Sequence, residues 1–111
     1  MIDLKLLSAI VNSLKEPVAF VNTDHVICFM NAAAIELYAK WGGADLIGKS
    51  VLDCHNEQSQ ATILEIFDEM QAGLDERLIS EKPTRRIYMR AVRDSDGKLL
   101  GYFERYEYPM E

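Results

Sequence analysis

The stretch Leu-Ile-Gly-Lys-Ser-Val-Leu-Asp-Cys-His-Asn-Glu at residues 46–57 decides how the rest of the chain is arranged. It joins a helix of small residues before it to a long amphipathic helix after it. Gly48 interrupts any helix that runs in from the N-terminal side. Asn56 is a favoured N-cap residue, and Glu57 places a carboxylate in the first turn, where the helix dipole stabilises negative charge. The stretch therefore predicts a helix that starts after Asn56 and runs to Gly73, a typical C-terminal stop.

Apolar residues on both sides of this stretch give the two helices their buried faces. In the long helix, Ile63, Ile66, Phe67 and Met70 are spaced i, i+3, i+4 and i+7, which places them on one face. Residues 32–41 form the preceding helix, which ends at two consecutive glycines.

A third, N-terminal helix is predicted over residues 3–15, before Pro17. Its apolar residues form one narrow stripe: Leu4, Leu7, Ile10, Val11 and Leu14. One short stripe cannot fold alone, so the helix either caps the core of its own domain or pairs with a second copy of the chain. The sequence leaves both possibilities open. It divides the chain into this helix, residues 1–16, and a globular domain over residues 17–111.

The strands follow from β-branched and aromatic runs separated by turn residues. Residues 18–21 and 26–30 form a hairpin around Asn-Thr-Asp-His, and residues 76–81 form a short strand. Residues 86–93 and 98–108 flank Asp-Ser-Asp-Gly, a strong hairpin signal. The fold class is thus α+β: a five-stranded antiparallel sheet with helices on one face and the first hairpin inserted centrally.

Composition limits the classes of function. The 111 residues are 49% hydrophobic and 27% charged, which is typical of one soluble globular domain. A net charge of -6 argues against nucleic acid and anionic membranes as partners. No apolar run approaches the ~20 residues of a membrane span. The two cysteines are expected to be reduced thiols in a cytoplasmic protein, and the length suggests a domain excised from a larger one.

Four short motifs, in this order, resemble those of PAS domains over essentially the whole chain. They are Asn22-Thr23-Asp24, Asn31-Ala32-Ala33, Leu46-Ile47-Gly48-Lys49-Ser50, and Val92 to Tyr102 around the last hairpin. His25 departs from the pattern, because many PAS sequences have glycine there. Residues 50–55 resemble a PAS subgroup that accompanies hemerythrin-like domains.

The resemblance implies a sensory or interaction module without catalysis of its own. Such domains hold a small molecule or cofactor between the helices and the sheet, or mediate dimers, and a separate output domain carries out the chemistry. The expected partners are a small-molecule ligand, a second copy of the chain and an output domain. The competing interpretation is a pure interaction domain whose core is filled by large side chains: Phe29, Ile35, Phe67, Met70, Met89 and Phe103.

His55 is the first candidate site residue, because haem sensors of the family carry a histidine on the long helix. Haem b is therefore the leading specific cofactor, with His55 as the iron ligand and Asp53 or a backbone carbonyl as partner of its other ring nitrogen. His55 stands at the start of the helix, whereas the haem sensors carry theirs within it. Met89, which alternates with Ile87 on the predicted core face, could be a second iron ligand. The commoner roles are a structural histidine and a core methionine.

Further pocket candidates are Cys54, Phe67, Met70, Ile87 and Phe103. Cys54 is expected to be a small buried hydrophobic residue or a redox-sensitive thiol. A nucleophile–base pair with His55 would need a third orienting group, and none is evident. The spacing of the two cysteines and two histidines fits no zinc-finger pattern.

On the face opposite the core, the sequence predicts a ladder of aromatic and charged residues. Arg86, Tyr88 and Arg90 are expected to face Tyr102, Glu104 and Tyr106 of the last strand. Three tyrosines among charges favour an interface, covered by the N-terminal helix of the same or a partner subunit. A solvated ladder of arginine–glutamate pairs is the alternative.

Overall fold

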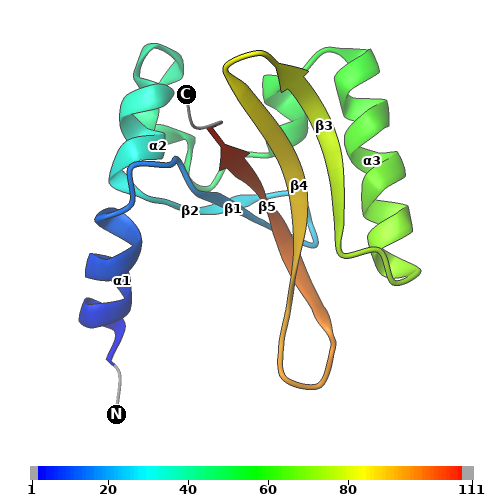
Figure 1. Cartoon of the computed structure of the whole chain (residues 1–111), viewed down its shortest axis with the longest axis horizontal. Coiled ribbons are helices and arrows are strands. Elements are labelled where there is room, and N and C mark those ends of the chain that lie inside the picture. Colours follow the sequence, from blue (N-terminus) through cyan, green and yellow to red (C-terminus); the bar gives the residue numbers. More distant parts are fainter. Residues whose placement is uncertain (1–2, 109–111) are drawn as a thin grey trace.

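The computed structural model describes residues 3–108, and its elements follow the predicted order (Figure 1). The α-helices are α1 (Leu4–Asn12), α2 (Ala32–Leu37) and α3 (Glu57–Gln71). The strands are β1 (Ala19–Asn22), β2 (Ile27–Met30), β3 (Glu76–Lys82), β4 (Arg85–Arg93) and β5 (Leu99–Glu107). Three short 3₁₀ helices connect α2 to α3: η1 (Ala39–Trp41), η2 (Gly43–Leu46) and η3 (Val51–Cys54). No helix in this part of the chain is long and apolar enough to cross a membrane.

The five strands form one antiparallel sheet in the order β2-β1-β5-β4-β3. The α+β class, the strand count and the antiparallel pairing are therefore confirmed. The predicted central position of the first hairpin is wrong, because β5 is the central strand and β2 lies at an edge. β5 is central because it pairs with β1 on one side and with β4 on the other. It therefore links the β1–β2 hairpin to β4 and β3.

Asparagine caps fix the starts of the two longer helices of the domain. The Asn31 side chain accepts a hydrogen bond from the Ala34 amide, and the Asn56 side chain accepts one from Ser59. α2 is shorter than predicted, because its α-helical part ends at Leu37. The chain then tightens into 3₁₀ turns.

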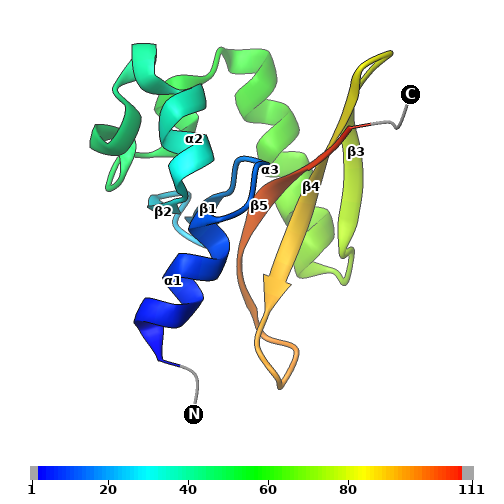
Figure 2. The same cartoon turned by 60° about the vertical axis from the view of Figure 1, so that its left-hand side comes forward.

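Both α2 and α3 cover the same face of the sheet, here called the inner face (Figure 2). α3 contributes its predicted stripe, in which Ile66, Phe67 and Met70 are buried and Ile63 is half-buried. They pack against apolar residues of the central strands, including Val21 and Met89. The core thus lies between α3 and the inner face, as the helical periodicity predicts.

The N-terminal helix does not cap this core. None of the described residues of α1 is buried, and in both views the helix extends away from the sheet (Figures 1 and 2). Leu4 is 82% exposed, and Leu7 and Ile10 are about half exposed. Within one chain, the capping role and the cover over the outer sheet face are therefore wrong.

The register of β5 corrects a second prediction. Tyr106 pairs with Ile87, Glu104 with Met89 and Tyr102 with Ala91, so these three β5 residues point to the inner face. The sequence analysis placed them on the outer face. The three residues do share one face of β5, as predicted. The strand is shifted by one residue from the expected register, and such a shift moves every side chain of the strand to the other face of the sheet.

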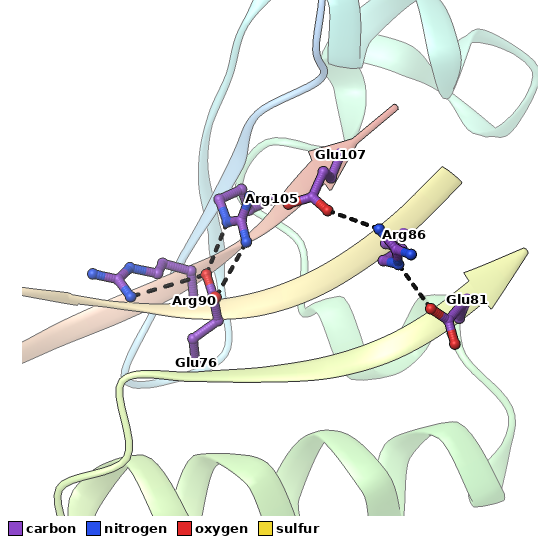
Figure 3. A network of polar contacts seen from close by, with 6 residues as sticks. All are labelled: Glu76, Glu81, Arg86, Arg90, Arg105 and Glu107. Carbon is purple, nitrogen blue, oxygen red and sulfur yellow. Dashed lines mark hydrogen bonds and ion pairs between the residues drawn. The ribbon is translucent and has the colours of Figure 1, made fainter. Parts of the chain in front are cut away.

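The outer face instead carries a network of ion pairs across β3, β4 and β5 (Figure 3). Arg105 binds both carboxylate oxygens of Glu76, at 2.8 and 3.2 Å, and its guanidinium lies 4.3 Å from the Tyr88 ring centre. Glu107 accepts from both Arg86 and Arg105 at 3.2 Å. These side chains are 25–58% exposed, so each pair contributes about 0–1 kcal/mol. In a single chain, this face is a partly exposed ladder of arginine–glutamate pairs, and its covering by a partner subunit stays a prediction.

Candidate ligand-binding site

A cavity of about 900 Å³ lies between the inner face of the sheet and the segment from η2 to α3, and it is partly open to solvent. Its apolar wall comes from the strands and from the buried face of α3. The main apolar side chains are Val21, Ile27, Met30, Leu46, Ile63, Ile66, Ile87 and Met89. A cavity of this size with a mostly apolar wall is within the range of small-molecule sites.

Polar groups gather on one part of this wall, where β4 and β5 approach the end of α2 and the start of α3. They include Tyr38, His55, Arg85, Glu104 and Tyr106. Gln58, Ser59, Thr62 and Ser80 also line the cavity. A few polar groups in an apolar cavity are what orients a ligand in a typical binding site.

Glu104 is the acidic group of this cluster. The Tyr106 hydroxyl donates to its Oε2 at 3.4 Å, and the Tyr38 hydroxyl lies 3.2 Å from that of Tyr106. Burial raises the pKa of the Glu104 carboxyl, and interactions with His55, Tyr106 and Arg85 offset this in part. A carboxylate can accept about four hydrogen bonds, so Glu104 has acceptor capacity directed at the cavity.

Arg85 is the basic group. It alternates with Arg86 along β4, so the two arginines point to opposite faces of the sheet. Arg86 pairs with Glu81 and Glu107 on the outer face. Within residues 3–108, Arg85 forms no ion pair with a carboxylate, although its charge acts on Glu104, Tyr38 and Tyr106.

His55 lines the cavity at the junction of η3 and α3. Its Nδ1 lies 2.7 Å from the Val51 carbonyl oxygen, so this nitrogen carries the proton and donates it. The lone pair is then on Nε2. The backbone carbonyl was one of the two partners predicted for this ring, whereas Asp53 is exposed.

The other predicted pocket residues divide into two groups. Met89, Ile87 and Cys54 line the cavity together with His55. Phe67 and Met70 do not line it, because they are buried in the core beside it.

Phe103 belongs to a different face from the one predicted. It borders the cavity, but it alternates with Tyr102 and Glu104 along β5 and pairs with Arg90. Its side chain therefore belongs to the outer face, for the same reason of strand phase that moves the tyrosines inward.

Cys54 is exposed, so the predicted buried hydrophobic role is wrong. It ends a 3₁₀ turn, and its Sγ is 3.9 Å from the Ser50 carbonyl oxygen. Within residues 3–108, the His55 ring bonds to the Val51 carbonyl and not to Cys54, so the two side chains form no Cys–His pair. Among the described residues, no group of three or more histidine, cysteine, aspartate or glutamate side chains could hold a metal ion.

His25, the departure from the PAS pattern, adopts the conformation that a glycine would. Its φ is 65°, in the left-handed region that is costly for a residue with a Cβ. The ring compensates by contacts: Nδ1 lies 2.8 Å from the Tyr102 hydroxyl, and the ring packs edge-on against Phe67. Burial lowers the pKa of His25. The turn is therefore retained, with an added link to β5.

Sequence reasoning missed Tyr38 and Glu104 as residues of the cavity. The alternation Tyr102-x-Glu104-x-Tyr106 was visible, but assigning it to a face required the register of β5 against β4. Ile87, Met89 and Ala91 mark the inner face of β4. They could identify the inner face of β5 only if the pairing of β4 with β5 were already known.

Comparisons with known proteins agree with this geometry. The model of the family described as PAS fold matches residues 5–102. A C-terminal domain from Streptococcus mutans superposes with a TM-score of 0.79 at 20% identity, covering 96% of this chain and 85% of that one. A PAS domain from Colwellia psychrerythraea gives 0.69 at 11% identity, covering 96% of both. The Vibrio cholerae receptor described as a dual PAS-heme oxygen sensor gives 0.61 at 16% identity, covering 85% of this chain and 94% of that one. No curated protein sequence matches the chain.

The five-stranded sheet, its helical cover and the cavity between them define a sensory-module class of domain. The chain belongs to the PAS family. Identities of 11–20% to the solved structures carry the fold and not the ligand. The predicted relation to the subgroup that accompanies hemerythrin-like domains stays a prediction.

Proposed function

We propose that this PAS domain is a non-catalytic ligand-binding sensor of a cytoplasmic signalling protein, in which an output domain responds to occupancy of the cavity. The observation that carries the proposal is the cavity itself. Protein cores are close-packed, with few voids larger than a water molecule. The space between α3 and the sheet is instead a cavity of about 900 Å³ that is partly open to solvent, which is the size of a small-molecule site. Its size favours the binder over a pure interaction domain with a filled core. The two exposed, unpaired cysteines suit a reducing compartment.

Filling the cavity tests this proposal. Ile63 lines the cavity from α3, whereas its neighbour Leu64 does not line it and is 41% exposed. We expect phenethyl alcohol to cause saturable amide shifts in β4, β5 and α3 of the wild type and of Leu64→Trp. Ile63→Trp should weaken the binding, because the larger indole takes up part of the space beside α3. An unchanged dissociation constant in a folded Ile63→Trp protein, or shifts that never saturate in the wild type, would refute the proposal.

A haem is the second candidate occupant, favoured by the anchored imidazole of His55. The Val51 carbonyl holds Nδ1 and leaves Nε2 as a donor atom, which is the arrangement that iron-binding histidines use. Met89 lies in the same cavity wall. When bound, haem would supply gas or redox sensing. The carboxylate of Glu104 in the same wall is unfavourable for the negatively charged porphyrin, so haem ranks second.

Absorption spectra with added hemin test the haem candidate. A sharp Soret band that disappears in His55→Ala and persists in His25→Ala would support it, since His25 does not line the cavity. A band indifferent to both changes would eliminate His55 as the ligand.

The N-terminal helix supports a second role, dimerisation. Its apolar stripe remains solvent-exposed in one chain, and exposed apolar stripes of this kind commonly mark interfaces. We expect Leu4→Glu with Leu7→Glu to give a monomer by light scattering, while Lys5→Glu, on a different side of the helix, leaves the dimer. A dimer that survives the double change would exclude the helix as its interface.

A further inference from the structure

The cavity wall carries one negative and one positive side chain that are not paired with each other. Glu104 on β5 and Arg85 on β4 both line the cavity. No ion pair joins them, although ion pairs connect most of the arginines on the other side of the same strands. Two opposite charges held apart in one cavity can both be satisfied by a ligand that bears two opposite charges.

The hydrogen bonds around Glu104 leave room for a donor. Within residues 3–108, Tyr106 is the one protein donor to Glu104, at the long distance of 3.4 Å. The Tyr106 hydroxyl is itself held by Tyr38, so the pair of tyrosines fixes one carboxylate oxygen, and no other donor of this part of the chain binds the second oxygen. An ammonium group, with three N–H donors, matches this unfilled capacity.

Arg85 offers the opposite chemistry. Its planar guanidinium has five N–H donors and binds carboxylates in a two-point contact. The wall near the core is apolar, with Ile66, Met89 and Ile27. A ligand with an ammonium, a carboxylate and an apolar body would therefore find a complementary group in the wall for each of its parts.

A singly charged ligand would fit less well. A simple amine would be attracted by Glu104 and repelled by Arg85. A simple carboxylate would be attracted by Arg85 and repelled by Glu104. Since charged groups in a partly dry site interact more strongly than in water, this double match favours a molecule that is neutral overall.

We propose that the cavity recognises a small zwitterion with an apolar side chain, the chemical class of the hydrophobic amino acids. Glu104 binds the ammonium group, Arg85 binds the carboxylate, and the α3 side of the cavity holds the side chain. This inference rests on the proposed function, because it names the class of ligand for that same cavity.

Four probes with the same phenyl group separate the contributions: L-phenylalanine, phenethylamine, hydrocinnamate and phenethyl alcohol. Amide shifts of the full chain at neutral pH give each dissociation constant. We expect phenylalanine to bind at least about ten-fold more tightly than any other probe, since a hydrogen bond to a charged group contributes about that factor or more.

Substitutions then assign each charge. Glu104→Gln should weaken phenylalanine and phenethylamine by about ten-fold and leave hydrocinnamate little changed. Arg85→Gln should weaken phenylalanine and hydrocinnamate and leave phenethylamine little changed. The matched controls Glu107→Gln and Arg86→Gln alter the same residue types on the same strands, but on the outer face. They should leave every constant within about two-fold, as exposed charges contribute little.

The outcomes separate this inference from the proposed function. If phenethyl alcohol binds and Ile63→Trp weakens its binding, but phenylalanine binds no more tightly, the sensor stands and the zwitterion is overturned. Equal effects of the cavity substitutions and their outer-face controls overturn it as well. If no probe binds at millimolar concentration, both proposals fall.

Discussion

Replacing Asn31 tests how the N-terminal helix is attached to the sensory domain. Its side chain is fully buried, with 0% exposure, and makes four hydrogen bonds. The carboxamide oxygen accepts from the amides of Val18 and Ala34, both at 2.9 Å. The amide nitrogen donates to the carbonyls of Val11 and Glu16, both at 3.0 Å. One residue thus connects α1, the segment between α1 and β1, and α2.

The magnitude follows from these four contacts. In Asn31→Ala the lost helix cap costs about 1 kcal/mol. The Val18 amide and the two carbonyls lose their partner in a partly buried place, at about 1 kcal/mol each. The expected loss in the free energy of unfolding is therefore about 4 kcal/mol, a large fraction of the roughly 5–15 kcal/mol of a typical domain.

Asn56 provides a matched control, because it also caps a helix but is exposed and makes a single side-chain bond, to the Ser59 amide. Asn56→Ala should cost only about 1 kcal/mol. Urea unfolding of both variants measures the difference, and we expect Asn31→Ala to be the less stable by about 3 kcal/mol. Equal losses would show that the buried amide does not connect α1 to the domain in the way described.

Two further substitutions test the β5 register and the buried carboxylate. Gly101→Ala should cost about 3 kcal/mol or more, because a Cβ there would lie 2.0 Å from the Val21 carbonyl oxygen at a φ of 154°. Gly97→Ala, which meets no atom within 4 Å, should cost about 1 kcal/mol in the same urea assay, and equal costs would contradict the β1–β5 contact. Glu104→Gln should raise the unfolding free energy at neutral pH, because burial raises the folded-state pKa of the carboxyl. The free energy of unfolding of the wild type should then fall as pH rises from the usual glutamate pKa through the raised one. This fall should be smaller in Glu104→Gln than in the control Glu107→Gln. Identical pH profiles of the two variants would refute the burial of Glu104.

The sequence predicted the local elements well because each signal is local. Asn56 caps α3, and the spacing of Ile66, Phe67 and Met70 faces the sheet as expected. The turn at residues 94–97 joins β4 to β5. Each of these depends on residues within a few positions of one another.

Features that depend on pairing between distant segments could not be predicted from the sequence. The phase of β5 fixes whether Glu104 or Phe103 faces α3, and it is set by the register against β4 and β1. The strongest aromatic signal was consequently assigned to the wrong face. Sequence analysis found His55 and Met89 in the cavity wall, but the charged pair that we propose as ligand contacts became visible only with this register.

Xenon binding to crystals of the wild-type protein tests the central claim most directly, because xenon enters apolar cavities without specific contacts. The account predicts xenon density between α3 and the inner face, beside Ile66 and Met89, and a reduced occupancy in Ile63→Trp but not in Leu64→Trp. A wild-type crystal with no xenon there, its space filled by core side chains, would contradict a ligand-binding cavity and favour a pure interaction domain.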